Sequence, residues 1–179
     1  MGGKQERRKY SIINIRFSMR RNFLIIFSLF ISGFVFGQGI RSVKITEVEK
    51  IIRESKTPLI INMWATWCIP CIEELPYFQK EVEEHRKDSI QLLLVSLDFK
   101  EAFPSGITKF INKRKIKARV IWLDETNADY FCPKIDAKWS GAIPATLFIN
   151  NNAGYRNFVE AQISHEKLKQ EIMALLEKK

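Results

Sequence analysis

Residues Leu59–Pro76 read LIINMWATWCIPCIEELP, and this stretch indicates how the rest of the chain is organised. Its first part, Leu59–Trp64, is almost continuously apolar, which predicts a strand buried on both faces of a sheet. The acidic segment after the cysteines favours a helix. Cys68 and Cys71, separated by two residues, lie between these elements and could close a small disulfide ring or bind a metal. Their place between a buried strand and a helix favours a redox-active pair.

The predicted helix start would make Cys68 reactive. Unpaired N–H groups and the dipole at a helix N-terminus favour a thiolate, which lowers the pKa of a thiol placed there. Pro70 suits the first turn, because its missing N–H would have no partner there in any case. We therefore expect Cys68 to attack a substrate disulfide and Cys71, one turn further in, to be the buried resolving thiol. A permanent structural disulfide is the alternative, but so small a ring constrains little chain.

The segment WATWCIPCIEELP resembles the active-site segment of the thioredoxin-like family. Within that family it is most similar to the extracytoplasmic TlpA/ResA branch, whose pattern is roughly WxxWCxPCxxExP. A second family landmark, GAIPAT, lies at Gly141–Thr146, and the resemblance covers roughly Ile45 to the C-terminus. The positions that match the active-site pattern are Trp64, Trp67, Cys68, Pro70, Cys71, Glu74 and Pro76.

The order of the predicted elements agrees with the fold that this resemblance implies. Strands that alternate with helices and end in a hairpin predict an α/β protein with a mixed central sheet and helices on both faces. Besides the central strand, we expect helices over 45–56, 70–87, 106–114 and 165–178, a helical turn within 124–135, and strands over 90–97, 120–123, 145–150 and 155–161.

Three local signals refine these helices. Thr46 is the expected N-cap of the first helix, since Glu49 three residues later completes a capping-box pattern. Ser164 is expected to cap the last helix. Pro76 lies inside the helix after the cysteines and is expected to kink it, because proline removes one backbone donor.

The resemblance also implies a role for Glu74, because the glutamate at this spacing in the TlpA/ResA branch is a buried acid that tunes the dithiol. A partly buried carboxyl has a raised pKa and can exchange protons with Cys71 near neutral pH. The alternative is an ordinary first-turn acid like Glu73. Thioredoxins proper carry a buried aspartate six residues before the first cysteine, where this chain has Asn62. Asn62 cannot take a proton, so Glu74 is the expected proton carrier.

Substrate contacts are expected from Ile143, Pro144 and Trp67. Ile143-Pro144 resembles the family's cis-proline, which would expose the backbone of residue 143 to an extended substrate pairing as an added strand. The alternative is a trans proline that opens a strand. Trp64 and Trp67 could be core or substrate-contacting residues, and Trp67, directly before Cys68, is the better candidate for substrate contact.

The net charge of +9 is concentrated at the N-terminus. Residues 1–37 contain seven Lys or Arg and one Glu, which leaves +3 for residues 38–179, from 22 basic and 19 acidic residues. A domain this mildly basic gives little reason to expect nucleic-acid binding. We expect one thioredoxin-like domain over 38–179, preceded by a targeting segment over 1–37.

The targeting segment has the layout of a secretory signal peptide. A basic cluster precedes Phe23–Phe36, an uncharged stretch that is short for a spanning helix, which needs about 20 apolar residues. Cleavage would make Gln38 the mature N-terminus, and an uncleaved membrane anchor is the alternative. Met19 is a second candidate for the first residue of the protein. In that case the start codon assigned to the gene would lie too far upstream, and residues 1–18 would not be translated. In either case we expect a periplasmic or otherwise extracytoplasmic protein.

Other kinds of site are less well supported by the sequence. Structural zinc takes four ligands, and the chain has three cysteines and two histidines without a second ligand pair at short spacing. Peroxidatic cysteines of a related family follow a threonine three residues earlier, where this chain has Ala65. Cys132 is expected to be a small buried residue, with a partner thiol near the active site as the alternative. The basic run Lys113–Arg119 is expected to be a solvated helix end, with an acidic partner as the alternative.

The resemblance implies an exported thiol-disulfide oxidoreductase that reduces disulfides in protein substrates, for example in apocytochrome c before haem attachment. A membrane thiol–disulfide relay would supply the electrons. No cofactor or metal is expected beyond the redox-active Cys68–Cys71 disulfide. An oxidase or isomerase is the alternative direction of the same chemistry, and a non-enzymatic binding module is a further one.

Overall fold

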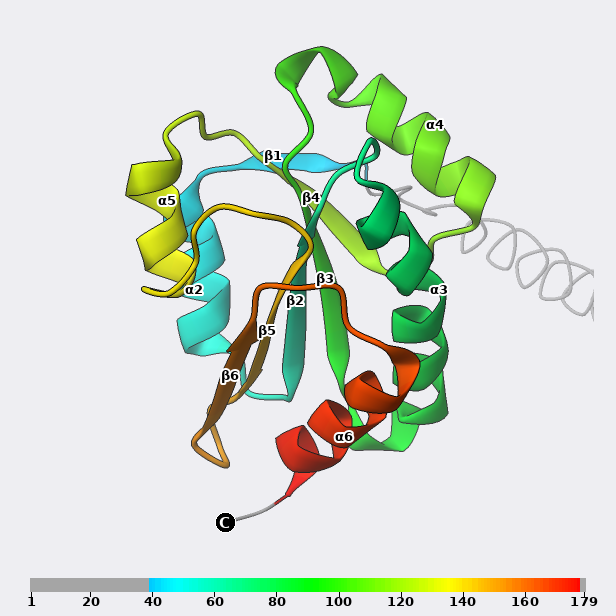
Figure 1. Ribbon diagram of the computed structural model, residues 1–179, viewed down its shortest axis with the longest axis vertical. Coiled ribbons are helices and arrows are strands. Elements are labelled where there is room, and N and C mark those ends of the chain that lie inside the picture. Colours follow the sequence, from blue (N-terminus) through cyan, green and yellow to red (C-terminus); the bar gives the residue numbers. More distant parts are fainter. Residues whose placement is uncertain (1–38, 178–179) are drawn as a thin grey trace, which may run out of the picture. The chain divides into compact units, whose positions relative to one another are not determined.

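A six-stranded sheet in the order β1-β4-β3-β2-β5-β6 forms the centre of the protein (Figure 1). The computed structural model describes residues 39–177, so the targeting segment expected over 1–37 lies outside the described residues. The strands are β1 (Arg41–Val43), β2 (Leu59–Trp64), β3 (Gln91–Ser96), β4 (Arg119–Leu123), β5 (Ala145–Asn150) and β6 (Tyr155–Val159).

The strand β2 lies at the middle of the sheet, as its apolar sequence predicts. It pairs in parallel with β3 and antiparallel with β5, and all six of its residues are buried. The mixed sheet follows from the connections. The β2–β3 crossover contains a helix, which allows a parallel pair, whereas a tight turn joins β5 to β6 as an antiparallel hairpin.

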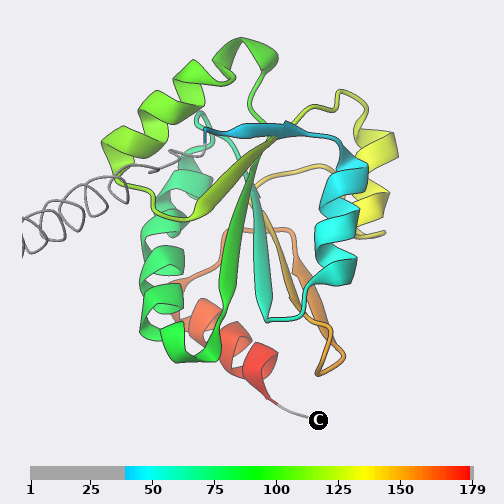
Figure 2. The same ribbon diagram turned by 180° about the vertical axis from the view of Figure 1, so that it is seen from behind.

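Helices cover both faces of this sheet (Figure 1, and from behind in Figure 2). Alternate residues of β2 point to opposite faces: Ile61 and Met63 join one buried cluster, whereas Ile60 and Trp64 join the other. The first cluster lies under α2 (Ile45–Glu54) and α5 (Ala128–Ile135), and the second under α3 (Ile69–Glu84), α4 (Ser105–Arg114) and α6 (His165–Leu176). The predicted fold class is confirmed.

The strand β1 is absent from the sequence-based prediction. It pairs in parallel with β4 at one edge of the sheet, through Arg41–Val43 against Ile121–Leu123. Three residues reading RSV are too short to show either strand alternation or an apolar run.

The predicted cap of the first helix is wrong, and that of the last is confirmed. Lys44, not Thr46, is the N-cap of α2, and the backbone N–H of Ile45 donates to Oε1 of Glu125 at 3.1 Å. This partner comes from a distant loop, so the local capping-box pattern could not predict it. Ser164 caps α6 as expected, with its Oγ accepting from the N–H of Lys167 at 3.2 Å.

The helix α3 continues past Pro76 and ends at Glu84, before the expected end at residue 87. A 3-10 turn, Arg86–Asp88, follows it, and Ser89 in the left-handed region at φ 57° ends that turn. The kink expected at Pro76 stays a prediction. Among residues 39–177, none of the helices is both long and apolar enough to cross a membrane.

Candidate active site

Cys68 and Cys71 form a disulfide at the first turn of α3, directly after the turn that follows β2. Cys68 is the N-cap of this helix, and its Sγ accepts a hydrogen bond from the N–H of Cys71 at 3.3 Å. The backbone N–H of Cys68 donates to the carbonyl of Ala65 at 3.1 Å, which closes the turn before the helix. The sulfur of Cys68 therefore lies at a helix N-terminus, as the sequence predicts.

The two cysteines differ in exposure, though less than expected. Cys68 is 5 % exposed and Cys71 is fully buried. Cys68 is more enclosed than a freely accessible nucleophile would be, because both cysteines lie in a hydrophobic cluster against which Ile143 also packs. Of the two cysteines, Cys68 is the one that keeps some exposed surface.

Asp98 holds the loop that leads into Cys68. Its buried carboxylate accepts from the backbone N–H of Thr66 at 3.0 Å and from the Thr66 hydroxyl at 2.5 Å. The Ser96 hydroxyl donates to the same carboxylate at 2.8 Å. The sequence analysis did not identify Asp98 as a site residue. Its position after a buried strand was an available signal, since the carboxyl ends of the parallel strands β2 and β3 meet at one edge of the sheet.

Glu74 is fully buried on α3, one turn after Cys71, as expected from the sequence. Burial raises the pKa of its carboxyl to about 7, although hydrogen bonds from Ile163 and Asn62 lower it. The Ile163 N–H donates to Oε2 at 2.9 Å, and Asn62 Nδ2 donates to Oε1 at 2.8 Å. A carboxyl with this pKa changes its protonation state near neutral pH. Its part in proton transfer stays a prediction.

The Ile143–Pro144 peptide bond is cis, as predicted. Pro144 is buried and Ile143 is half-buried, and β5 begins at the next residue.

The loop before this cis bond is held from two sides. The Glu160 carboxylate accepts from the backbone N–H groups of Ser140 and Ala142, each at 3.0 Å, and from the Ser140 hydroxyl. The hydrogen bond from the Ser140 side chain and those from the two backbone groups hold the pKa of Glu160 below its usual range. On the other side, Trp139 Nε1 donates to the carbonyl of Ala142 at 2.8 Å. The sequence analysis did not identify Glu160 or Trp139 as supports of this loop.

Exposed apolar side chains surround the disulfide. Trp67 is 54 % exposed, as expected for a residue that contacts substrate, whereas Trp64 is fully buried and belongs to the core. Phe99, which the sequence analysis missed, is 70 % exposed and stacks on Trp67 with ring centroids 5.9 Å apart. Ile69, between the cysteines, is 69 % exposed. Apolar groups left in water beside a reactive group are typical of a surface that a partner covers.

Cys132 lies apart from the disulfide. It is buried in the cluster under α2 and α5, whereas Cys68 and Cys71 belong to the cluster on the other face of the sheet. Burial, with smaller effects from Glu160 and Asp129, raises the pKa of its thiol to about 11. Cys132 is therefore a buried structural residue, as expected, and not a partner thiol of the disulfide.

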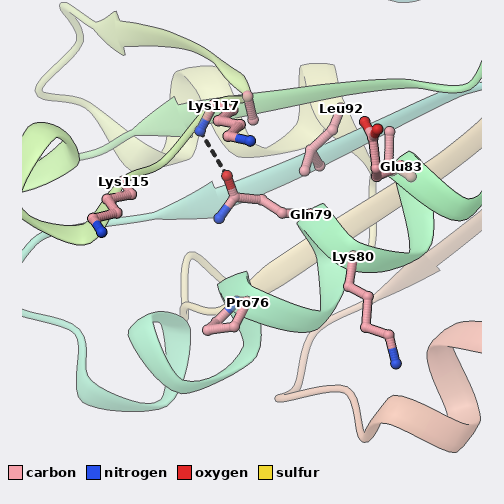
Figure 3. Close-up of a pocket in the computed structure, with 9 residues that line it drawn as sticks. Pro76, Gln79, Lys80, Glu83, Leu92, Lys115 and Lys117 are labelled. Carbon is pink, nitrogen blue, oxygen red and sulfur yellow. Dashed lines mark hydrogen bonds between the residues drawn. The ribbon is translucent and has the colours of Figure 1, made fainter. Parts of the chain in front are cut away.

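An open depression elsewhere on the surface carries the basic residues after α4. It lies between α3 and the segment leading to β4, and Figure 3 shows Gln79 Oε1 accepting from the backbone N–H of Lys117 at 2.6 Å. Its lining contains no cysteine, and none of the predicted site residues contributes to it. The residues that line it are Pro76, Gln79, Lys80, Val82, Glu83, Leu92, Lys115, Lys117 and Ala118. In the described part of the chain, no three His, Cys, Asp or Glu side chains gather where they could hold a metal ion.

Comparison with known proteins identifies the family of the chain. Residues 38–154 match the profile of the family described as the AhpC/TSA family. The chain belongs to the AhpC/TSA family. The thioredoxin-like character expected from the sequence is confirmed, since this family membership agrees with the structural neighbours of the chain.

Two relatives illustrate the similarity within this family. The thiol-disulfide oxidoreductase ResA of Oceanobacillus iheyensis is 28 % identical over 110 residues, which cover 62 % of this chain and 53 % of the relative. The sporulation thiol-disulfide oxidoreductase A of Bacillus subtilis is 34 % identical over 62 residues, 35 % of this chain and 38 % of the relative. The chain spans about half the length of the curated relatives it matches.

Solved structures confirm the fold. A thioredoxin-related protein from Neisseria meningitidis serogroup B superposes with a TM-score of 0.58 and 22 % identity, over 69 % of this chain and 89 % of that protein. StoA from Bacillus subtilis superposes with a TM-score of 0.50 and 24 % identity, over 68 % of this chain and 86 % of that one.

Proposed function

We propose that this member of the AhpC/TSA family is an extracytoplasmic thiol-disulfide oxidoreductase that reduces disulfides in protein substrates. The observation that carries the proposal is the Cys68–Cys71 disulfide at the start of α3, in which Cys68 keeps a small exposed surface and Cys71 is fully buried. The names of the relatives, which are thiol-disulfide oxidoreductases, support the same reaction. No cofactor beyond this cysteine pair is required, because thiol–disulfide exchange moves electrons between sulfur atoms alone.

The reaction begins from the reduced protein. The Cys68 thiolate attacks one sulfur of a substrate disulfide, a mixed disulfide forms, and the other substrate sulfur leaves as a thiolate. Cys71 then gives its proton to the Glu74 carboxylate and attacks the Cys68 sulfur. This second step forms the Cys68–Cys71 disulfide and releases, as a thiolate, the substrate sulfur that was bound to Cys68. Two electrons have passed to the substrate, and a dithiol donor, proposed to be a membrane thiol–disulfide relay, reduces the pair again.

The loop at Ile143–Pro144 is proposed to bind the substrate chain beside the disulfide. An extended substrate segment would pair with the backbone of Ile143 as an added strand, while Trp67, Ile69 and Phe99 cover its apolar side chains. An exposed apolar surface of this kind suits an unfolded or flexible polypeptide, whose own apolar side chains are accessible.

The reduction potential of the Cys68/Cys71 pair tests the direction of the reaction. We expect a value below about −220 mV, toward the roughly −270 mV of thioredoxin, measured by equilibration with glutathione or dithiothreitol buffers in a Cys132→Ser background. A value near about −120 mV would make the protein a disulfide donor and overturn the proposed direction. If Cys68 and Cys71 cannot be reversibly oxidised and reduced in these buffers, the enzymatic proposal is contradicted altogether.

A second prediction concerns Glu160 and the substrate loop. In Glu160→Gln the carboxylate charge is lost and the hydrogen bonds to Ser140 and Ala142 weaken, so the loop should be less well ordered for substrate pairing. We expect KM for a reducible protein substrate to rise by roughly 3- to 10-fold, the effect of losing one hydrogen bond of about 1 kcal/mol, with kcat nearly unchanged. Steady-state kinetics with oxidised insulin measure both constants.

Glu84→Gln is the matched control for this variant, because Glu84 is exposed at the far end of α3 and pairs only with Lys80 among the described residues. Its kinetic constants should equal those of the unmodified protein. An unchanged KM in Glu160→Gln would show that the loop does not depend on this carboxylate for substrate binding.

A thiol peroxidase is a second candidate, because that activity also uses a cysteine on a related fold. The position three residues before Cys68 disfavours it. Ala65 is fully buried and has no hydroxyl group, so the expected threonine is missing. Measurable peroxide turnover by the reduced protein, at a rate above that of disulfide exchange, would reverse this preference.

A further inference from the structure

We propose that Asn62 is a positioning residue for Glu74: its side-chain amide holds the Glu74 carboxylate and sets how readily that carboxylate takes up and releases a proton. The inference rests on the proposed function only in its last link, where that proton is the one exchanged with Cys71. The hold on Glu74 itself can be measured without any substrate.

The amide of Asn62 is fixed between two neighbours. Asn62 is fully buried in β2, and its Nδ2 donates to Glu74 Oε1 at 2.8 Å and to Thr146 Oγ1 at 3.0 Å. Thr146 is the register partner of Asn62 on β5, so strand pairing places the second acceptor. Both acceptors face the nitrogen, and the –NH₂ group has one hydrogen for each.

The oxygen of the same amide has no partner. Asn62 Oδ1 is buried and makes no hydrogen bond within the described residues. A buried polar atom without a partner costs free energy. The hydrogen bond from the amide nitrogen to the Glu74 carboxylate must offset that cost. Turning the amide over would place Oδ1 against the Glu74 oxygens, which an ionised carboxylate would repel. The observed orientation is therefore the one that stabilises the charged form of Glu74.

Asparagine suits a site that must exist in two protonation states. When Glu74 is protonated, a turned amide can accept the acid O–H at Oδ1, and the Thr146 hydroxyl can donate to the same oxygen. In that arrangement the nitrogen, not the oxygen, would be unpaired. One end of the amide is thus unsatisfied in either state. The bond to the ionised carboxylate is the stronger of the two, so Asn62 can meet both forms of Glu74 but favours the charged one.

The other groups around this carboxyl cannot serve the same purpose. The second donor is the backbone N–H of Ile163, from the segment before α6, which no side-chain change removes. On α3 itself, Tyr77 and Glu73 are the nearby titratable groups, and both add negative charge when they ionise. From α6, His165 pairs with Glu81 instead, with Nε2 and Oε1 2.6 Å apart. Asn62 is the side-chain donor that reaches the carboxyl.

The test compares Asn62→Leu with Thr146→Val. Both replace a buried polar side chain by an apolar one with the same number and branching of heavy atoms, but only the first removes a hydrogen bond to Glu74. The side-chain carboxyl shift of ¹³C-labelled glutamate is followed by NMR against pH in the oxidised protein. We expect Asn62→Leu to raise the titration midpoint of Glu74 by about one pH unit, since the lost bond favoured the charged form. Thr146→Val should move it by less than about half of that.

Asn62→Asp keeps the test decisive if the leucine variant does not fold. It places two carboxyl groups against each other, so the pair should titrate in two separated steps, one below and one above the midpoint of Glu74 in the unmodified protein. A single unchanged midpoint in either Asn62 variant would overturn the proposal. Because these titrations use no substrate, a failed redox assay would count against the proposed function and leave this result standing.

Discussion

The Cys71→Ser variant is expected to capture substrates as stable mixed disulfides, while Cys68→Ser should show only the uncatalysed rate of disulfide reduction. Cys68 lies at the helix N-terminus and is the less buried of the pair, whereas Cys71 is fully buried. Removing Cys71 therefore leaves the first attack intact and abolishes the step that releases the substrate. Mass spectrometry and non-reducing gels should show one substrate molecule bound per protein through Cys68.

This experiment is best performed with Cys132 replaced by serine in both variants, so that only one thiol remains in each. Cys132 is buried on the other face of the sheet, and its removal should not alter capture. Capture by Cys68→Ser and none by Cys71→Ser would reverse the roles of the two cysteines. Capture by neither would contradict disulfide exchange at this site.

The second large effect concerns the pH dependence of stability. Burial raises the pKa of Glu74 from 4.5 to about 7 in the folded protein. The folded state therefore binds this proton more tightly than the unfolded chain does. The stability that this provides is fully present below pH 4.5 and is lost as the pH rises through 7. At about 1.4 kcal/mol per pH unit, the loss is on the order of 3 kcal/mol in the free energy of unfolding.

Glu74→Gln should remove this dependence, because the amide stays neutral at every pH. Urea unfolding of the oxidised protein at several pH values from 4 to 8 measures the free energy of unfolding for both proteins. The difference between them should change by about 3 kcal/mol across this range, with the unmodified protein losing stability as the pH rises. Glu73→Gln is the matched control, since Glu73 is exposed and should leave the curve unchanged. Parallel curves for the unmodified protein and Glu74→Gln would mean that the Glu74 carboxyl titrates as it does in water.

Much of the site could be predicted from the sequence because its parts are local. The buried strand and the Cys68 helix start each depend on neighbours within a few residues, whereas the cis bond before Pro144 was expected from the family resemblance. Except for Trp139, which bonds Ala142 three residues later, the supports that were missed bond to segments far along the chain. Asp98 holds Thr66 across 32 residues, and Glu125 caps α2 across 80 residues. A single sequence shows that such an acid exists, but not which loop the fold brings to it.

The exposure of the site shows the same limit. The sequence correctly placed Cys68 at a helix N-terminus. The near-complete burial of Cys68, however, depends on packing in a cluster that also contacts Ile143, far along the chain. Phe99 was missed for a similar reason. It is one of several phenylalanines in the sequence, and only the folded loop shows that it stacks on Trp67 in water.

The short strand β1 also determines where the folding unit begins. Without it, β4 would be the edge of the sheet, and the backbone N–H and C=O groups of Ile121–Leu123 would be open to pairing with another molecule. The residues just after the expected cleavage point thus protect the protein from aggregation, with the charged Arg41 at the new edge. The family match begins at residue 38 and so includes this strand, and a shortened form of the domain that keeps the edge of β4 covered must retain these residues.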